Sequence, residues 1–210
     1  MDATSFQLTG DDLDRLADDG FFVRDSFLSQ DICRILRREI EHRARAGELD
    51  RAGTGRGDNY QRNSTIRGDY ITWLDRDTRD YPWDLVLEQF ERLRVGLNRR
   101  GFLGLNDCEI QIARYPGDGS GYERHLDAFA GDANRRVTAI TYLNETWRPS
   151  DGGALRLYPE DRSTIDIDPV AGRLVVFLSK ELEHGVRPAF APRFAVTSWY
   201  RSSAPFRVAI

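Results

Sequence analysis

The second half of the chain contains several short segments rich in β-branched and aromatic residues, each bounded by turns that contain glycine or proline. From Glu109 onward these segments read EIQIARY, RRVTAITYLN, GALRLYP, RLVVFLS and RFAVTSWYR. Short strands at such spacing are typical of an antiparallel sandwich or barrel, because the alternation of side chains buries one face of each strand. We therefore expect a β-barrel of the jelly-roll type in this part of the chain.

The first half of the chain shows instead the periodicity of amphipathic helices. Thr9 and Ser29 stand where N-caps are expected, and Gly20 stands where the first helix would end. A third helix is expected from Tyr81 onward. The predicted fold class is α+β, with a double-stranded β-helix (jelly-roll) core at residues 109–201 and helical support packed outside it over residues 1–108. At 210 residues, we expect one domain.

Composition restricts the partners of the chain. A net charge of -4 argues against a nucleic-acid partner, which would require a basic excess. Cys33 and Cys108 are too few and too scattered for a disulfide framework or a zinc motif. The acidic N-terminus lacks the apolar core of a signal peptide, and no run approaches the roughly 18 apolar residues of a membrane span. We therefore expect a cytoplasmic protein with no membrane partner, and the single lysine, Lys180, favours GC-rich bacterial DNA.

A polar, glycine-rich segment at about residues 47–70 separates the second and third expected helices. It runs into a strand-like stretch, DYITWL. Loops of this length inside a compact domain are usually functional. The segment is therefore predicted to be a lid over a site.

Two of the three histidines of the chain have a spacing that suits a metal site. His125 and Asp127 are two residues apart, so in an extended strand both side chains point to the same face, with Leu126 turned away. His184 follows the segment RLVVFLS, and an antiparallel barrel can bring the end of that strand beside the pair. Two imidazoles and one carboxylate leave one face of an ion open, which suits non-haem Fe(II). Zinc would accept the same ligands, and a His-x-Asp pair also arises by chance.

An arginine follows His184 at the start of the last strand-like segment. In that strand Arg193 shares one face with Thr197 and Trp199. An arginine directed into a barrel interior requires an anionic partner, because an unpaired buried charge costs several kcal/mol. The partner is either an internal carboxylate or a dicarboxylate cosubstrate that binds the metal at its other end.

Together these residues resemble the iron- and 2-oxoglutarate-dependent dioxygenases. The surrounding stretches are similar to one branch of that family, the hypoxia-inducible-factor type of prolyl hydroxylase. These stretches are IRGDYITW, YPGDGSGYERHLD, VTAITYLN, GGALRLYP and RFAVTSWY. The resemblance implies an Fe(II) cofactor and the cosubstrates 2-oxoglutarate and O2, with ascorbate as a further candidate.

The resemblance also implies a role for individual residues. The metal ligands would be His125, Asp127 and His184. The cosubstrate side would comprise Arg193, Tyr142, Tyr115, Thr197, Ile140, Leu155 and Val186, with Arg193 and Tyr142 on the distal carboxylate and Tyr115 near the chelating end. The substrate side would comprise Trp199, Arg67, Asp69 and Arg135, with Arg67 and Asp69 at the base of the lid. No catalytic residue is expected beyond the metal site.

The function implied by the resemblance is hydroxylation at C4 of a prolyl residue in a flexible loop of a protein. For a bacterial enzyme, elongation factor Tu is a candidate substrate, and an oxygen-sensing role would follow from a low oxygen affinity. Two alternatives stay open: hydroxylation of free proline or another small metabolite, and a jelly-roll module that senses metal or 2-oxoglutarate without turnover. The glycine-rich lid differs from that of the animal enzymes, which leaves the substrate undetermined.

Overall fold

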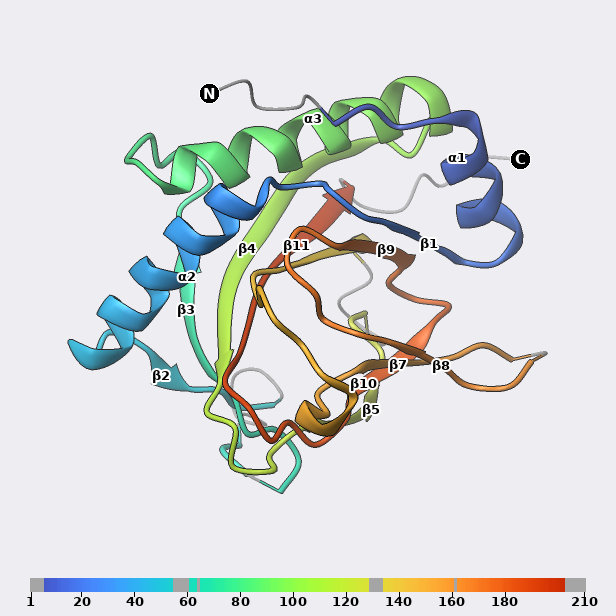
Figure 1. Ribbon diagram of the computed structural model, residues 1–210. Coiled ribbons are helices and arrows are strands. Elements are labelled where there is room, and N and C mark those ends of the chain that lie inside the picture. Colours follow the sequence, from blue (N-terminus) through green and yellow to red (C-terminus); the bar gives the residue numbers. More distant parts are fainter. Residues whose placement is uncertain (1–5, 55–60, 64, 129–133, 161, 203–210) are drawn as a thin grey trace.

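A computed structural model describes residues 6–54, 61–63, 65–128, 134–160 and 162–202. Two antiparallel sheets pack together, and three helices lie against the larger one (Figure 1). This arrangement confirms the predicted α+β jelly-roll class. The assignment of residues 1–210 to one domain stays a prediction.

The larger sheet has seven strands in the order β1-β9-β6-β11-β4-β3-β2, and the smaller has four in the order β5-β10-β7-β8. The helices are α1 (Gly10–Asp18), α2 (Gln30–Arg45) and α3 (Trp83–Gly101), with a short 3-10 helix at Pro149–Asp151. The strands of the larger sheet are β1 (Phe21–Arg24), β2 (Asp50–Arg51), β3 (Tyr70–Leu74), β4 (Leu105–Tyr115), β6 (Arg135–Tyr142), β9 (Leu174–Leu178) and β11 (Arg193–Ser202). Those of the smaller sheet are β5 (Tyr122–His125), β7 (Leu155–Tyr158), β8 (Ile165–Ile167) and β10 (Glu183–Val186).

Side-chain caps begin the first two helices, as predicted. Asp12 N–H donates to the Thr9 hydroxyl, and Thr9 N–H donates to the Asp12 carboxylate at 2.8 Å, which completes a capping box. Ile32 N–H donates to the Ser29 hydroxyl at the start of α2. Gly20 follows α1 with φ of +80°, a conformation that glycine adopts without strain.

The main core lies between the helices and the larger sheet. Leu36 of α2 and Phe90 of α3 are buried in the same cluster as Val196 and Tyr200 of β11. The Tyr200 hydroxyl donates to the Phe90 carbonyl at 2.8 Å, so its polar group is satisfied inside this apolar layer. The even-numbered side chains of β11 therefore face the helices, which turns the odd-numbered ones toward the smaller sheet.

The third histidine lies on a strand of its own. We expected His184 to follow the strand that contains RLVVFLS, and that strand, β9, ends at Leu178. The chain then turns and enters the smaller sheet as β10, where His184 is directly opposite His125 of β5. The end of β9 lies beside His184, since the ring centroids of Phe177 and His184 are 4.5 Å apart. The separate strand β10 was not recognised, because four residues are too few to show a period.

Some expectations fall on residues that the structure does not describe. The predicted lid at about 47–70 includes residues 55–60 and 64, which lie outside the described residues, as do 129–133 and the C-terminal residues 203–210. Among the described residues, no helix has both the length and the apolar character needed to cross a membrane.

Candidate active site

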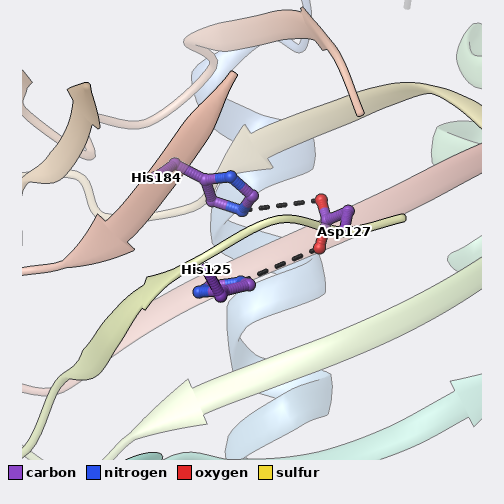
Figure 2. A group of neighbouring side chains, drawn as sticks. All are labelled: His125, Asp127 and His184. Carbon is purple, nitrogen blue, oxygen red and sulfur yellow. Dashed lines mark ion pairs between the residues drawn. The ribbon is translucent and has the colours of Figure 1, made fainter. Parts of the chain in front are cut away.

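The two histidines and the aspartate converge at the junction of β5 and β10 (Figure 2). Nε2 of His125 is 3.8 Å from Oδ1 of Asp127, and Nε2 of His184 is 3.5 Å from Oδ2 of the same carboxylate. One ligand atom from each residue lies within 4.8 Å of the others. Three donors at this separation match the spacing needed to coordinate one ion.

Backbone carbonyls orient both imidazole rings. Nδ1 of His125 is 2.7 Å from the Glu123 carbonyl, and Nδ1 of His184 is 3.3 Å from the Leu182 carbonyl. A proton on each Nδ1 satisfies these carbonyls and leaves the Nε2 lone pairs directed at the centre of the group. The rings are thus prepared as neutral metal ligands.

The carboxylate of Asp127 is fixed from the opposite side by β6. The Thr138 hydroxyl donates to Oδ2 of Asp127 at 2.7 Å and lies 2.8 Å from the Ser179 hydroxyl. All three groups are buried. A buried partner of this kind orients a ligating carboxylate and raises the affinity for the metal.

The electrostatics of the group favour a cation. Burial, together with the neighbouring His184, lowers the pKa of His125 to about 3. Burial alone would raise the pKa of Asp127, but the two imidazoles and the Thr138 hydroxyl bring it below its ordinary value. At neutral pH the site therefore presents neutral His125 and one carboxylate, the protonation states that metal ligation requires.

A cavity of about 490 Å³ opens between the two sheets in front of this group. The predicted site residues that border it are His125, Asp127, His184, Arg193, Tyr115, Thr197, Ile140, Leu155, Val186, Trp199, Arg67, Asp69 and Arg135. Gly53 and Thr54, from the described part of the predicted lid, border it as well. Tyr142 is absent from this lining but lies beside Arg193, whose guanidinium carbon is 5.0 Å from the Tyr142 ring centroid.

Arg193 lies at the closed end of the cavity, with only 3% of its surface exposed. Its Nε donates to the Gly153 carbonyl at 2.8 Å, and its guanidinium carbon is 5.2 Å from the ring centroid of Tyr115. Among the described residues, no carboxylate lies within ion-pair distance of Arg193. The buried Tyr142 hydroxyl likewise has no hydrogen-bond partner in the described part of the chain. A buried cation without a carboxylate partner and a buried hydroxyl without a hydrogen-bond partner favour a bound anion over the internal salt bridge that the sequence left open.

The residues predicted on the substrate side are held by ion pairs and aromatic rings. Arg67 donates to both carboxylate oxygens of Asp69, at 2.8 and 3.0 Å, and also to Gln111 at 2.8 Å. Its guanidinium carbon is 4.7 Å from the ring centroid of Tyr122. The pair thus joins the segment before β3 to β4 and β5, at the edge of the cavity.

Sequence reasoning missed several residues of the cavity. In β4 the alternating residues Glu109, Gln111 and Ala113 border it together with Tyr115, and two polar residues on the inward face of a strand were an available signal. The Thr138 contact had no such signal, because it depends on a long-range pairing. Leu126 was expected to turn away from the site, but it borders the cavity, since β5 ends at His125 and the strand alternation ends there too.

The family model for the "2OG-Fe(II) oxygenase superfamily" matches residues 110–201. A Pseudomonas putida prolyl-4-hydroxylase structure is 41% identical, with a TM-score of 0.82 over 92% of this chain and 98% of that one. The chain therefore belongs to the 2OG-Fe(II) oxygenase superfamily. Membership gives its metal and cosubstrates as Fe(II), 2-oxoglutarate and dioxygen.

Within the superfamily, the chain is similar to prolyl hydroxylases of the hypoxia-inducible-factor type. A Trichoplax adhaerens prolyl hydroxylase, solved in complex with a hypoxia-inducible-factor peptide fragment, is 31% identical with a TM-score of 0.82. That match covers 91% of this chain and 87% of the other. The human prolyl hydroxylase EGLN3 is 37% identical over 64% of this chain, and the match spans 59% of the length of EGLN3.

Proposed function

We propose that this chain is a prolyl 4-hydroxylase that acts on a prolyl residue of a protein. The observation that carries the proposal is Arg193, a buried cation with no carboxylate beside it in the described residues, at the closed end of a cavity that also contains the His125, Asp127 and His184 group. A chelating dicarboxylate that spans the cavity would satisfy both ends at once.

The residues present fit the metal and the cosubstrate. His125, Asp127 and His184 would hold Fe(II) on one face, which leaves the cavity face open to other ligands. The guanidinium of Arg193 and the hydroxyl of Tyr142 would bind the distal carboxylate of 2-oxoglutarate, because both are buried and lack an anionic partner among the described residues. Tyr115 would lie toward the chelating end.

Bound Fe(II), with 2-oxoglutarate and dioxygen, supplies the oxidation of an unactivated C–H bond, and the cosubstrate leaves as succinate and carbon dioxide. The protein would position the cosubstrate and the substrate and exclude water from the cavity. The apolar side chains of Ile140, Leu155 and Val186 would exclude water from the cosubstrate, with Thr197 beside them. Thr138 keeps the Asp127 carboxylate turned toward the metal.

The proposed substrate is a proline in a flexible loop of another protein. Trp199 would form a wall for the prolyl ring, while Arg67, Asp69 and Arg135 would contact the flanking chain. The peptide complex of the Trichoplax enzyme supports a protein substrate over free proline. Elongation factor Tu is a candidate target for a bacterial enzyme, and an oxygen-sensing role, use of ascorbate and a cytoplasmic location belong to the same proposal.

The test uses the purified protein with Fe(II), 2-oxoglutarate and isotopically heavy dioxygen in a lysate of the source organism. Mass spectrometry of the proteome then locates heavy oxygen on prolyl residues. We expect a labelled proline that disappears when the His125→Ala variant replaces the natural protein, because the variant lacks one of the three metal ligands.

Two other results would favour a different function. Succinate formed only after small metabolites are added, without any labelled protein, would indicate a metabolite hydroxylase. Neither product, from protein shown to contain iron, would leave the sensing module as the better explanation.

A further inference from the structure

A bulge in β6 directs Arg135 into the mouth of the cavity. Tyr200 of β11 is opposite Val137, but the next residue, Arg201, is opposite Arg135, so Arg136 is an extra residue without a partner on β11. Val137 faces the helical core. Without the extra residue, Arg135 would point to the same face as Val137. The bulge instead turns the Arg135 side chain toward the cavity, and Arg135 borders this cavity.

Three groups hold the guanidinium of Arg135. Its central carbon lies 4.3 Å from the ring centroid of Trp199. Nε and Nη2 both donate to Oε2 of Glu109, at 2.9 and 2.6 Å, while Nη1 is 3.5 Å from the Asp127 carbonyl. The side chain is only 11% exposed, so this ion pair is well shielded from solvent screening.

Glu109 also belongs to a longer network of ion pairs. Its other oxygen accepts from Arg201 at 3.1 Å. Arg201 also pairs with Asp107, and Asp107 pairs with Arg76 at 2.6 Å. Basic and acidic groups alternate along the network, and the last arginine is half-exposed at its outer end. The two guanidinium groups beside Glu109 hold its carboxylate in place at the cavity.

We propose that Glu109 is a specificity residue. Because Glu109 engages the guanidinium of Arg135, the cavity mouth beside Trp199 binds a substrate less well when an acidic side chain stands next to the target proline. The proposal rests on the proposed prolyl hydroxylase function. An approaching aspartate or glutamate finds the donors of Arg135 engaged and meets the Glu109 carboxylate at close range, which is unfavourable. A neutral side chain avoids this repulsion, and a lysine or arginine finds a carboxylate that is still 23% exposed.

The test compares short synthetic peptides that contain one proline and carry aspartate, asparagine or lysine directly before or after it. Hydroxylation by the iron- and 2-oxoglutarate-loaded enzyme gives kcat/KM for each peptide. Fluorescence anisotropy gives Kd for the same peptides with Mn(II) and 2-oxoglutarate in the absence of dioxygen. We expect the natural protein to prefer the asparagine and lysine peptides over the aspartate peptide by roughly tenfold in both measurements.

The Glu109→Gln variant keeps the shape of the side chain but removes its charge. In this variant the preference over the aspartate peptide should fall to about onefold or be inverted. Arg135 is then able to donate hydrogen bonds to the substrate carboxylate. Glu88→Gln is the matched control: Glu88 is an exposed acid on α3 that pairs with Arg92, and its loss should leave the peptide preference unchanged. Circular dichroism checks that both variants are folded.

Three results would overturn the inference, and they differ in their meaning. Peptides that are hydroxylated without charge preference, or with a preference that Glu109→Gln leaves intact, would refute the role of Glu109 alone. No hydroxylation and no binding of any prolyl peptide by the natural protein would refute the proposed function together with the inference. A preference that changes equally in Glu88→Gln would assign the effect to net charge instead of to the mouth.

Discussion

Arg193 is buried at a place where the protein itself supplies no counter-charge in its described residues. Burying an uncompensated cation destabilises the folded state, and replacing it with an apolar side chain of similar volume is often neutral or favourable. We therefore expect this residue to lower the stability of the ligand-free protein and to supply affinity for the proposed dianion. Functional sites commonly show this exchange.

We expect Arg193→Met to leave the Tm of the ligand-free protein unchanged or raised. The hydrogen bond to Gly153, worth about 1 kcal/mol, and the guanidinium contacts with two tyrosine rings are lost, but an uncompensated buried charge is removed. The same variant should raise the 2-oxoglutarate requirement by roughly two orders of magnitude, because a buried charge pair with the cosubstrate is worth several kcal/mol. Thermal shift with and without 2-oxoglutarate and Mn(II) measures both effects. A large fall in the Tm of the ligand-free variant would instead reveal an internal anionic partner.

Thr138 and Thr141 offer a matched pair of substitutions on the two faces of β6. Thr138→Val removes the hydrogen bond to Asp127, so metal affinity should fall by roughly 10- to 100-fold. Thr141→Val should leave metal affinity unchanged, because the buried Thr141 hydroxyl has no partner among the described residues. Titration with Co(II) or Mn(II) distinguishes them. Equal effects would mean that the contact to Asp127 does not matter for the metal.

Sequence reasoning succeeded where side-chain identity alone carries the chemistry. His125, Asp127, His184 and Arg193 were recognisable because few roles suit such residues at such spacing, and all four border one cavity. Residues that act through another group, such as Thr138, were not recognised. Their role depends on which strand lies opposite, and that information is not local in the sequence.

At the scale of elements, the junction of β5 and β10 determines whether the metal ligands meet. Gly121 precedes β5, and a Cβ at this position would lie 2.4 Å from the Val186 carbonyl of β10. Contacts this short do not occur, so a side chain here must push the two strands apart. Glycine is thus required for the close approach that brings His125 opposite His184.

Gly121→Ala should therefore weaken metal binding at least roughly tenfold and lower the Tm, because the displaced strand carries a metal ligand. Gly10→Ala is the control: its nearest neighbour would be 3.9 Å away, at the N-terminus of α1, and alanine favours a helix. Isothermal titration with Mn(II) measures the affinity. Unchanged affinity in Gly121→Ala would show that β5 is not held by this contact.

The elements themselves were predictable in proportion to their length. Long strands such as β4 and β11 show a clear alternation, and the helices show caps and periodicity. The short strands β1, β8 and β10 were not assigned in the sequence, because three or four residues do not establish a period. Strand order was inaccessible for a further reason: pairing depends on contacts between residues far apart in the chain.

At the scale of the whole molecule, the buried imidazole of His125 couples stability to pH. The folded-state pKa of His125, about 3, lies below its ordinary value of 6.5, so the unfolded chain binds the proton first as the pH falls. The stability contributed by neutral His125 is complete above about pH 6.5 and is lost progressively toward pH 3.

We expect the free energy of unfolding of the metal-free protein to fall by up to about 1.4 kcal/mol per pH unit between pH 6.5 and 4.5. His125→Gln should flatten this dependence, while His42→Gln, at an exposed position of α2, should not. Urea denaturation at several pH values gives the slopes. An unchanged slope in the His125 variant would place the titrating group elsewhere.

The strand order of the larger sheet also determines whether residues 109–201 can be separated from the rest of the chain. The family model matches only residues 110–201, yet β1 covers the outer side of β9, and β3 covers the outer side of β4. A fragment of residues 109–201 would leave two rows of backbone N–H and C=O groups unpaired, and such edges join with those of other molecules. Analytical ultracentrifugation should find this fragment aggregated and the full chain dispersed. We therefore expect that the segment matched by the family model requires β1 and β3, which lie outside it, to remain dispersed in solution.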